Sequence, residues 1–314
     1  MSGEPLGSPA SLTLNTGAVI GEVLVREEQH GAQALLCGCY DGQPTSEAPV
    51  PTLVISNCGD RLGTIAFEND GPESRRSTSA ECFAFRDDIH REIARLEQWS
   101  VDHGWQHAWP QLDVIVADRY RISKSLVPAW NGNAGRMELP AWRVVTGKAA
   151  IMHELVHVLF PNGNRFLAEG LAIYLQAEIG GNPAFPNFGR PLHAVAREVL
   201  QELAPECEAR PSATLDAICL AQLDAIATPA PLTLQVRSNF CGEEPRGQGR
   251  IYPLAGSFTQ HLVATHGLEP FRSIYFQTPL VPQKQSRGQA DRWLRVYGCS
   301  LADLEREWKS MIAA

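Results

Sequence analysis

The chain has 314 residues, of which 44% are hydrophobic and 20% are charged, and its formal net charge is -8. These proportions are typical of a globular protein, and the length suits two or three packed subdomains. The sequence has no basic run and no alternation of basic with aromatic residues, which argues against nucleic acid as a partner. No segment approaches the roughly 18 consecutive apolar residues of a membrane-spanning helix, and no secretory signal is visible, so the localisation stays open.

The first part of the chain has the pattern of a β-rich segment. Short runs of β-branched and aliphatic residues alternate with Gly, Pro, Asp and Asn, which favour turns. The polar stretch 69–79 interrupts this pattern, so we expect a separate N-terminal β-rich segment over residues 1–79. The predicted strands are 18–25, 33–39, 52–56 and 63–67.

Residues 80–180 combine strands with helices and form the second predicted region. Apolar residues such as Phe85 and Ile89 recur at three- and four-residue steps, which is typical of an amphipathic helix, here ending near Gly104. The apolar run 112–117 predicts a buried strand. Further predicted elements are a loop at 121–133, strands at 136–139 and 142–145, and helices at 147–160 and 166–179.

Beyond residue 181 the pattern is mainly helical, which predicts a C-terminal helical subdomain over residues 181–314. Ser300 is a favourable N-cap for the last of these helices. Together with the two preceding regions, this pattern predicts an α+β chain. The predicted helices are 191–203, 214–226, 253–265, 288–297 and 300–312.

Eight cysteines are spread along the chain, and an even number permits disulfides without showing them. In a chain of this length we favour buried free thiols. Cys37 and Cys39 form the only close pair in the sequence, and no second pair complements them, which gives little support to a four-cysteine zinc site. A disulfide-rich extracellular module is the alternative.

The helix predicted at 147–160 contains His153-Glu154-Leu155-Val156-His157, which fits the pattern H-E-x-x-H. Histidines four residues apart share one helix face, so both imidazoles can reach one ion. Thr146 can cap this helix, and its other positions are mostly apolar, which predicts burial. A buried polar group without a partner costs about 1–3 kcal/mol, and a metal with its water provides partners for all three side chains. The alternative is a core helix whose histidines bond backbone carbonyl groups.

The turn after this helix predicts the third ligand. Pro161 ends the first helix, and Asn164 is a good cap for the second. In the antiparallel helical hairpin that results, Glu169 lies level with His157. Gly170 costs about 1 kcal/mol relative to Ala inside a helix, which indicates close packing against another helix. Two histidines and one glutamate leave a fourth position for water, as in catalytic zinc sites.

The HELVH motif, followed closely by FLAEGLAIYL at 166–175, resembles the gluzincin branch of the zincin metallopeptidases, in particular the peptidase MA-like group. The similarity covers residues 145–180 and is looser around Tyr252 and in the closing helix. The resemblance implies a zincin-like catalytic domain with a mixed-sheet upper lobe and a helical lower lobe. It also implies Zn²⁺ as the cofactor, with His153, His157 and Glu169 as ligands and Glu154 as the general base. Ile173 departs from the family, since several relatives have an acidic residue there.

The predicted reaction is hydrolysis of a peptide bond in a peptide or protein substrate. Glu154 takes a proton from water and passes it to the leaving amine, and a further donor should stabilise the oxyanion. Tyr252 is our candidate donor, with an ordinary interface tyrosine as an equal alternative. His261 and His266 are five residues apart, which turns them to different helix faces, so we expect packing and surface roles rather than a second metal site.

Two other functions stay open at this point. Gly135-Arg136-Met137-Glu138-Leu139 resembles the G-x-M-E-N motif of exopeptidases, which leaves an aminopeptidase as an alternative. Its position before the metal helix also suits a sheet-edge strand that pairs with substrate. The second alternative is a non-catalytic scaffold stabilised by zinc. Glu154 argues against the scaffold, because structural zinc needs no general base.

Overall fold

The computed structural model describes residues 10–13, 19–27, 33–38, 52–56, 61–68, 70–71, 77–105, 108–128, 131, 134–203, 220–230, 232, 234–235, 245–246, 248–281, 288–289 and 291–314. The chain divides into two compact units. One comprises Met1–Arg91 and Ala108–Ala149, and the other Glu92–His107 and Ala150–Ala314. A mixed sheet in the first unit and a set of helices in the second make the chain an α+β protein, as the sequence predicts.

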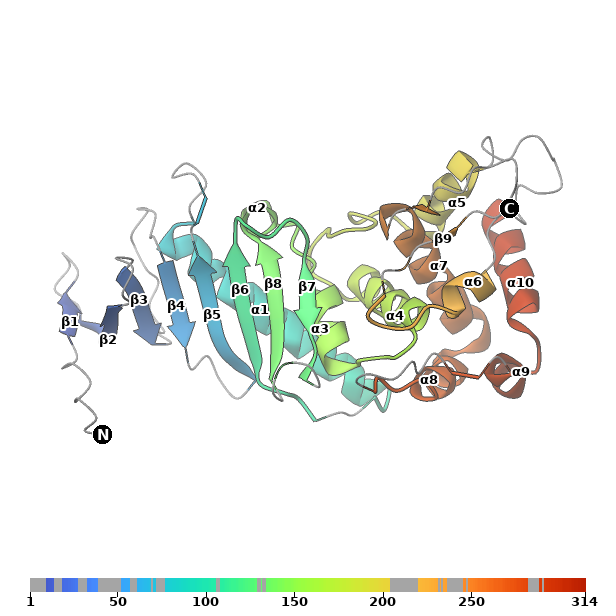
Figure 1. Cartoon of the computed structure of the whole chain (residues 1–314), viewed down its shortest axis with the longest axis horizontal. Coiled ribbons are helices and arrows are strands. Elements are labelled where there is room, and N and C mark those ends of the chain that lie inside the picture. The colour runs from blue at the N-terminus through green and yellow to red at the C-terminus, as the bar shows by residue number, and fades with distance from the viewer. Residues whose placement is uncertain are drawn as a thin grey trace. The chain divides into compact units, whose positions relative to one another are not determined.

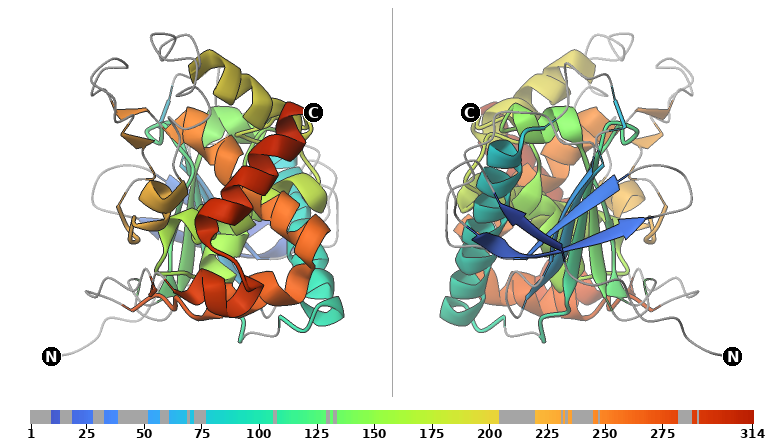
Figure 2. Two further views of the ribbon diagram at one scale, coloured as in Figure 1. Left: turned by 90° about the vertical axis from the view of Figure 1, so that its right-hand side faces the viewer. Right: turned by 90° about the vertical axis from the view of Figure 1, so that its left-hand side faces the viewer.

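The sheet of the first unit has the strands β1 (Ala10–Thr13), β2 (Val19–Glu27), β3 (Gln33–Gly38), β4 (Thr52–Ser56), β5 (Leu62–Glu68), β6 (Leu112–Ala117), β7 (Lys124–Leu126) and β8 (Gly135–Pro140). Their order is β1-β2-β3-β4-β5-β6-β8-β7, and Figure 1 shows them side by side. The pairs β3–β4, β5–β6 and β6–β8 are parallel, and the others are antiparallel. Successive strands rotate relative to one another, as sheets of L-amino acids do (Figure 2, right).

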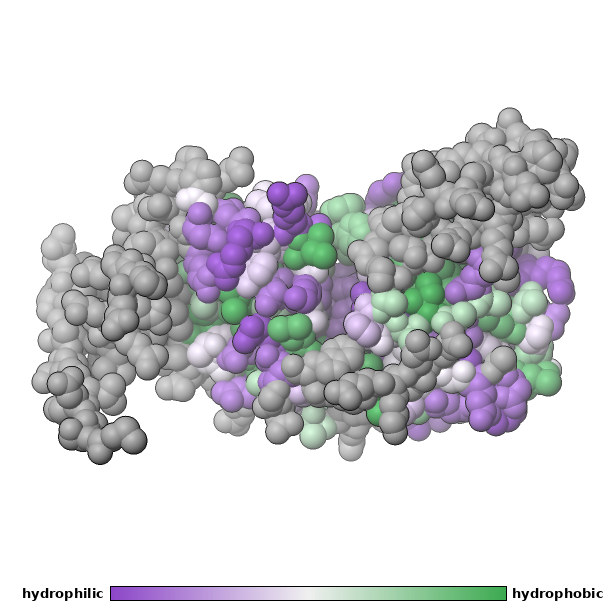
Figure 3. Space-filling view, in the orientation of Figure 1, coloured by the Kyte–Doolittle hydropathy of each residue, from purple (hydrophilic) through white to green (hydrophobic). Residues whose placement is uncertain are grey.

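One face of β5, β6 and β8 is apolar and buried, because their residues alternate between the two faces. The first part of α1 (Ser79–Asp102) packs on this face, where the rings of Phe67 and Phe85 meet edge to face at 5.9 Å. The opposite face carries residues such as Asp113 and Glu138, and Figure 3 shows hydrophilic residues prevailing there. The alternation thus fixes which face of the sheet receives a helix.

Four of the expectations for this region differ from the structure. Because β5 pairs with β6, the predicted regions 1–79 and 80–180 share one sheet. Residues 142–145 are not a strand but belong to helix α2 (Ala141–Val145). The predicted loop 121–133 contains β7, which pairs with Arg136–Glu138 of β8. The expectation that 135–139 forms a sheet edge is therefore wrong, since β8 lies between β6 and β7 and the edge is β7.

The second unit contains the remainder of α1 and the helices α3 (Ile151–Leu159), α4 (Arg165–Glu178), α5 (Leu192–Leu203), α6 (Leu220–Asp224), α7 (Gln248–His266), α8 (Leu268–Phe276), α9 (Arg292–Tyr297) and α10 (Leu301–Ala313). A two-stranded ribbon joins β9 (Leu234–Gln235) to β10 (Pro245–Arg246). α7 packs against α4, α5, α8 and α10, and the left view of Figure 2 shows α10 lying across the other helices. Among the described residues, no helix is long and apolar enough to cross a membrane.

Most helices of this unit match the predicted ones, with four differences. α9 begins at Arg292, four residues after the predicted start at residue 288. α7 begins five residues before the predicted start at residue 253, so that Pro253 lies inside the helix. α8 was not predicted, although Leu268, Phe271 and Ile274 follow a helical spacing. Of the predicted helix 214–226, residues 214–219 lie outside the described part of the chain, and residues 220–226 contain the short helix α6.

Two further sequence predictions concern packing and thiols. A Cβ added at Gly170 of α4 would lie 2.3 Å from Oγ1 of Thr259 on α7, which confirms that this glycine permits close helix packing. Gly256 of α7 has a similar role, because its added Cβ would lie 2.3 Å from Cγ2 of Ile173. Cys82 and Cys299 are free thiols, and the side chains of the other six cysteines lie outside the described part.

Candidate metal centre

The hairpin of α3 and α4 places the HELVH motif in the core of the second unit. Every residue of α3 except His157 is buried, as its apolar sequence predicts. Asn164 caps α4, since its side-chain oxygen accepts from the amide of Leu167 at 3.1 Å. Thr146, by contrast, does not cap α3: it is the C-cap residue of α2, and α3 begins after Ala150 without a side-chain cap.

The turn between the two helices is held by hydrogen bonds from α8. The side-chain amide of Asn162 donates to the carbonyl of Tyr275 at 2.8 Å, and its oxygen accepts from the amide of Asn164 at 2.8 Å. The hydroxyl of Tyr275 donates to the carbonyl of Phe160 at 2.6 Å. The last residue before Pro161 and the cap of α4 are thereby fixed relative to each other, which sets the register of the hairpin.

The hairpin brings the three predicted ligands together. Nε2 of His153 and Nε2 of His157 lie 3.1 Å apart. Oε2 of Glu169 lies 3.2 Å from the former nitrogen and 3.4 Å from the latter. The amide of His153 also donates to Oε1 of Gln176 at 3.2 Å, so the two helices are paired in opposite chain directions. The predicted antiparallel arrangement is therefore present.

The two oxygens of Glu169 have different surroundings. Oε1 is paired with the guanidinium of Arg165, and it accepts a hydrogen bond from the hydroxyl of Tyr252 at 3.0 Å. Arg165 also donates to the hydroxyl oxygen of Tyr252 at 3.2 Å. Oε2 faces the two histidines and has no hydrogen-bond partner among the described residues, although Glu169 is 0% exposed. Arg165 and Tyr252 thus provide partners for Oε1, while Oε2 points at the two imidazoles.

Burial and charge act in opposite directions on the pKa values at this site. Burial alone would raise the pKa of Glu169, but Arg165 and the two histidines hold it well below its ordinary value. Burial alone would lower the pKa of His153, but the hydrogen bond and charge of Glu169, with the charge of Glu154, raise it instead. The arrangement therefore favours an ionised carboxylate beside groups that attract a cation or a proton.

The spacing of the three atoms fits a tetrahedral zinc ion. Zinc bonds to imidazole nitrogen and carboxylate oxygen at about 2.0–2.2 Å, so neighbouring ligands of a tetrahedral ion are about 3.3–3.6 Å apart. The three distances here, 3.1, 3.2 and 3.4 Å, lie within or slightly below that range. Imidazole and carboxylate are also the ligand types that suit zinc. The unpartnered Oε2 of Glu169 would gain a partner from such an ion.

Glu154 and Tyr252, the two predicted catalytic residues, are related to the three ligands in different ways. Glu154 is buried, and its charge acts on both His153 and Arg165, which places it in the field of the site. Tyr252 belongs to α7, and its ring lies 6.3 Å from that of His153. Its hydroxyl is bonded to Glu169, and burial raises its pKa, so the phenol stays protonated.

Arg165 and Gln176 are the site residues that the sequence prediction did not name. The sequence does contain a signal for Arg165, because this residue precedes Glu169 by four positions and such pairs meet on one helix face. Gln176 had none, because its bond to His153 depends on the packing of two helices. Nδ1 of His153 has no hydrogen-bond partner among the described residues.

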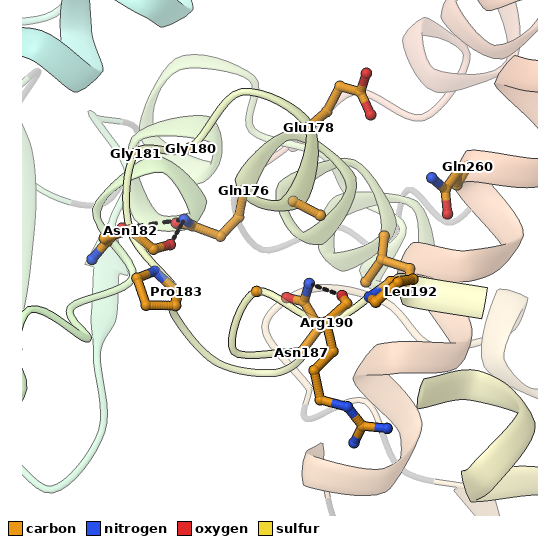
Figure 4. A pocket seen from close by; sticks show the side chains of 13 residues that line it. Gln176, Glu178, Gly180, Gly181, Asn182, Pro183, Asn187, Arg190, Leu192 and Gln260 are labelled. Atoms are coloured by element: carbon orange, nitrogen blue, oxygen red, sulfur yellow. Dashed lines mark hydrogen bonds between the residues drawn. The ribbon is translucent and has the colours of Figure 1, made fainter. Parts of the chain in front are cut away.

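A pocket of about 380 Å³ lies beside the C-terminal end of α4 (Figure 4). Gln176 lines it and donates to the carbonyl of Asn182 at 3.1 Å, across the loop that follows α4. The three predicted ligands are not among the described residues that line this pocket, and Gln176 links it to the candidate centre through its bond with the amide of His153.

No protein-family model matches the chain, and no curated protein matches it either. The resemblance of HELVH and FLAEGLAIYL to the gluzincins is a likeness of short motifs only.

Proposed function

We propose that this protein is a zinc-dependent metallopeptidase with a zincin-like fold, whose metal is held by His153, His157 and Glu169. The observation that supports this most strongly is the distance set of 3.1, 3.2 and 3.4 Å among three potential ligand atoms on one buried hairpin. A further carboxylate, Glu154, lies in the same field. A structural site with four protein ligands would need neither an open position nor this acid.

Each residue of the site has a separate role in the proposed hydrolysis. Zinc, when bound, supplies a Lewis acid that lowers the pKa of water and polarises the scissile carbonyl. Glu154 accepts the proton of the attacking water and returns it to the leaving amine. Arg165 and Tyr252 hold Oε1 of Glu169, which directs Oε2 at the two histidines. Tyr252 is also our candidate for the donor to the oxyanion, through rotation of its hydroxyl away from Glu169.

The test combines metal analysis with an assay on a broad peptide mixture. The wild type should carry zinc at this centre and cleave peptide bonds, and Glu154→Gln should keep the zinc and lose the cleavage. Glu178→Gln is the matched control, because Glu178 is an exposed glutamate at the end of α4. The product lengths distinguish an aminopeptidase, which releases single residues, from an endopeptidase.

Two outcomes would contradict the proposal. A Glu154→Gln protein as active as the wild type would remove the general base from the mechanism. Zinc binding at the hairpin with no cleavage by the wild type would favour the zinc-stabilised scaffold instead.

A further inference from the structure

A second group of potential ligands lies where α7 meets α10. Nε2 of His266, the last residue of α7, lies 3.2 Å from Oε2 of Glu307 on α10. Nε2 of His261 lies 3.8 Å from Oε1 of the same carboxylate. The three ligand atoms all lie within 4.8 Å of one another. His261 is buried and His266 is partly exposed, which agrees with the packing and surface roles that the sequence predicts, but the carboxylate of Glu307 from another helix lies near both imidazoles.

His261 is the buried member of this group, and its two ring nitrogens have different surroundings. It is 3% exposed, and its Nδ1 is hydrogen-bonded to Oγ1 of Thr265 at 3.3 Å. Its Nε2 has no hydrogen-bond partner among the described residues, although it points to Glu307 and His266. A buried polar atom without a partner is unfavourable, and native structures seldom leave one. A ligand between the three side chains would provide that partner.

A simple ion pair accounts for only part of this arrangement. Protonated His266 paired with Glu307 explains the contact of 3.2 Å, but it leaves Nε2 of His261 unbonded. It also leaves unbonded the buried hydroxyl of Tyr297, whose ring packs edge-on against His266 at 5.5 Å. The carboxylate, by contrast, turns one oxygen toward each histidine.

We propose that His261, His266 and Glu307 form a second site for a divalent transition-metal ion, with Zn²⁺ as the ion that best suits two imidazoles and a carboxylate. Bound there, the ion links the C-terminal end of α7 to α10. This site is independent of the HELVH centre and of the proposed activity.

The experiment measures zinc bound per chain by equilibrium dialysis of the full-length protein and elemental analysis. His266→Ala and Glu307→Gln should each bind one zinc fewer than the wild type. Both side chains are partly exposed, at 26% and 44%, so these changes spare the core. Glu269→Gln, at a glutamate that is 72% exposed on α8, should bind as much zinc as the wild type.

Zinc added to the wild type should also raise its melting temperature more than it raises that of either variant. Equal zinc content in the wild type and both variants would overturn the proposal, even if the variants melt at a lower temperature, because that result indicates an ion pair only. His153→Ala distinguishes this site from the HELVH centre. It should remove the ion of the HELVH centre, while Glu307→Gln in that background should still remove one further zinc per chain. Circular dichroism verifies that each variant is folded.

Discussion

The hydroxyl of Tyr252 donates to Oε1 of Glu169 over 3.0 Å, which ties α7 to α4 at the candidate metal centre. Arg165 contacts the same oxygen. With Oε1 held by two donors, the carboxylate has a fixed orientation, and Oε2 faces the two histidines. The partners of a ligand commonly set its orientation in this way, and their loss weakens metal binding.

Tyr252→Phe should therefore weaken zinc binding at this centre by about 10–100-fold, the usual effect of losing a partner of a ligand. If Tyr252 also contacts the oxyanion, kcat falls in zinc-saturated protein while KM changes little. Competition with a chelator gives the affinity, and steady-state kinetics gives kcat and KM. Tyr174→Phe, at a tyrosine of α4 outside the site, serves as the control. Unchanged affinity and unchanged kcat would exclude both roles.

Arg165→Met should destabilise the zinc-free protein by about 3–5 kcal/mol, because it leaves the buried carboxylate of Glu169 without its cationic partner. Zinc should recover part of that loss, since the ion supplies the missing positive charge. Urea denaturation with and without zinc measures both quantities. Arg306→Met is the control, because its ion pair with Asp303 is exposed and should contribute less than about 1 kcal/mol. A loss that zinc does not reduce would contradict this account.

The pH dependence of stability should reverse when zinc binds. In the zinc-free protein the raised pKa of His153 stabilises the fold below 6.5, and this contribution is lost as the pH rises through the raised value. The lowered pKa of Glu169 stabilises the fold above 4.5, and this is lost as the pH falls through the lowered value. The pair therefore contributes most between these two ordinary values.

Zinc requires neutral imidazoles, so its stabilising effect should instead grow as the pH rises through the raised pKa of His153. Melting temperatures measured with zinc and with chelator from pH 5 to pH 8 test this. The difference between the two curves should increase with pH, and a constant difference would show that His153 takes no part in binding. Glu307→Gln protein gives the same comparison without the second proposed ion.

The hairpin was predictable because its signals are local. The apolar positions around His153 have helical spacing, and Pro161 and Asn164 mark the end of one helix and the start of the next. Ligands four residues apart on one helix need no knowledge of the fold. Glu169 followed because a short turn fixes which residues of two antiparallel helices are level.

The remaining errors come from short segments whose pattern is ambiguous and from contacts between separate elements. Trp142–Val145 is short and β-branched at its end, a pattern that a strand and a short helix share, and it is helical after Pro140. The pairing of β7 with β8 joins residues on either side of a loop. The contact of Glu307 with His261 and His266 depends on how α10 crosses α7, which neither helix encodes alone.

A buried network fixes the start of α4 and gives a further prediction. Asn164 donates to Oδ1 of Asp224 at 2.9 Å, and the same carboxylate receives Arg292 and the indole of Trp293, the latter at 3.0 Å. Asp224→Asn should destabilise the protein by about 3–5 kcal/mol, because Arg292 is only 2% exposed and would lose its counter-charge. Asp291→Asn, in an exposed pair with Arg295, should cost less than about 1 kcal/mol. Equal losses in urea denaturation would contradict this.

Gly170→Ala tests the close contact of α4 with α7, and the sign of its effect is the informative result. In an ordinary helix this change adds about 1 kcal/mol of stability. Here the new Cβ would lie 2.3 Å from Oγ1 of Thr259 and 3.1 Å from the carbonyl oxygen of Ala255, so one helix must shift. We expect a net loss of about 1–3 kcal/mol, the usual cost of overpacking.

Thr259→Ala removes the nearer of the two atoms and leaves the backbone contact at 3.1 Å. In that background Gly170→Ala should cost less, and a double-mutant cycle from urea denaturation measures the difference as a coupling free energy. Because Gly170 follows Glu169 directly, a shift of α4 away from α7 also lengthens the bond between Tyr252 and Glu169. Zinc affinity should therefore fall in Gly170→Ala and recover in the double variant, whereas a coupling of zero would place the two residues out of contact.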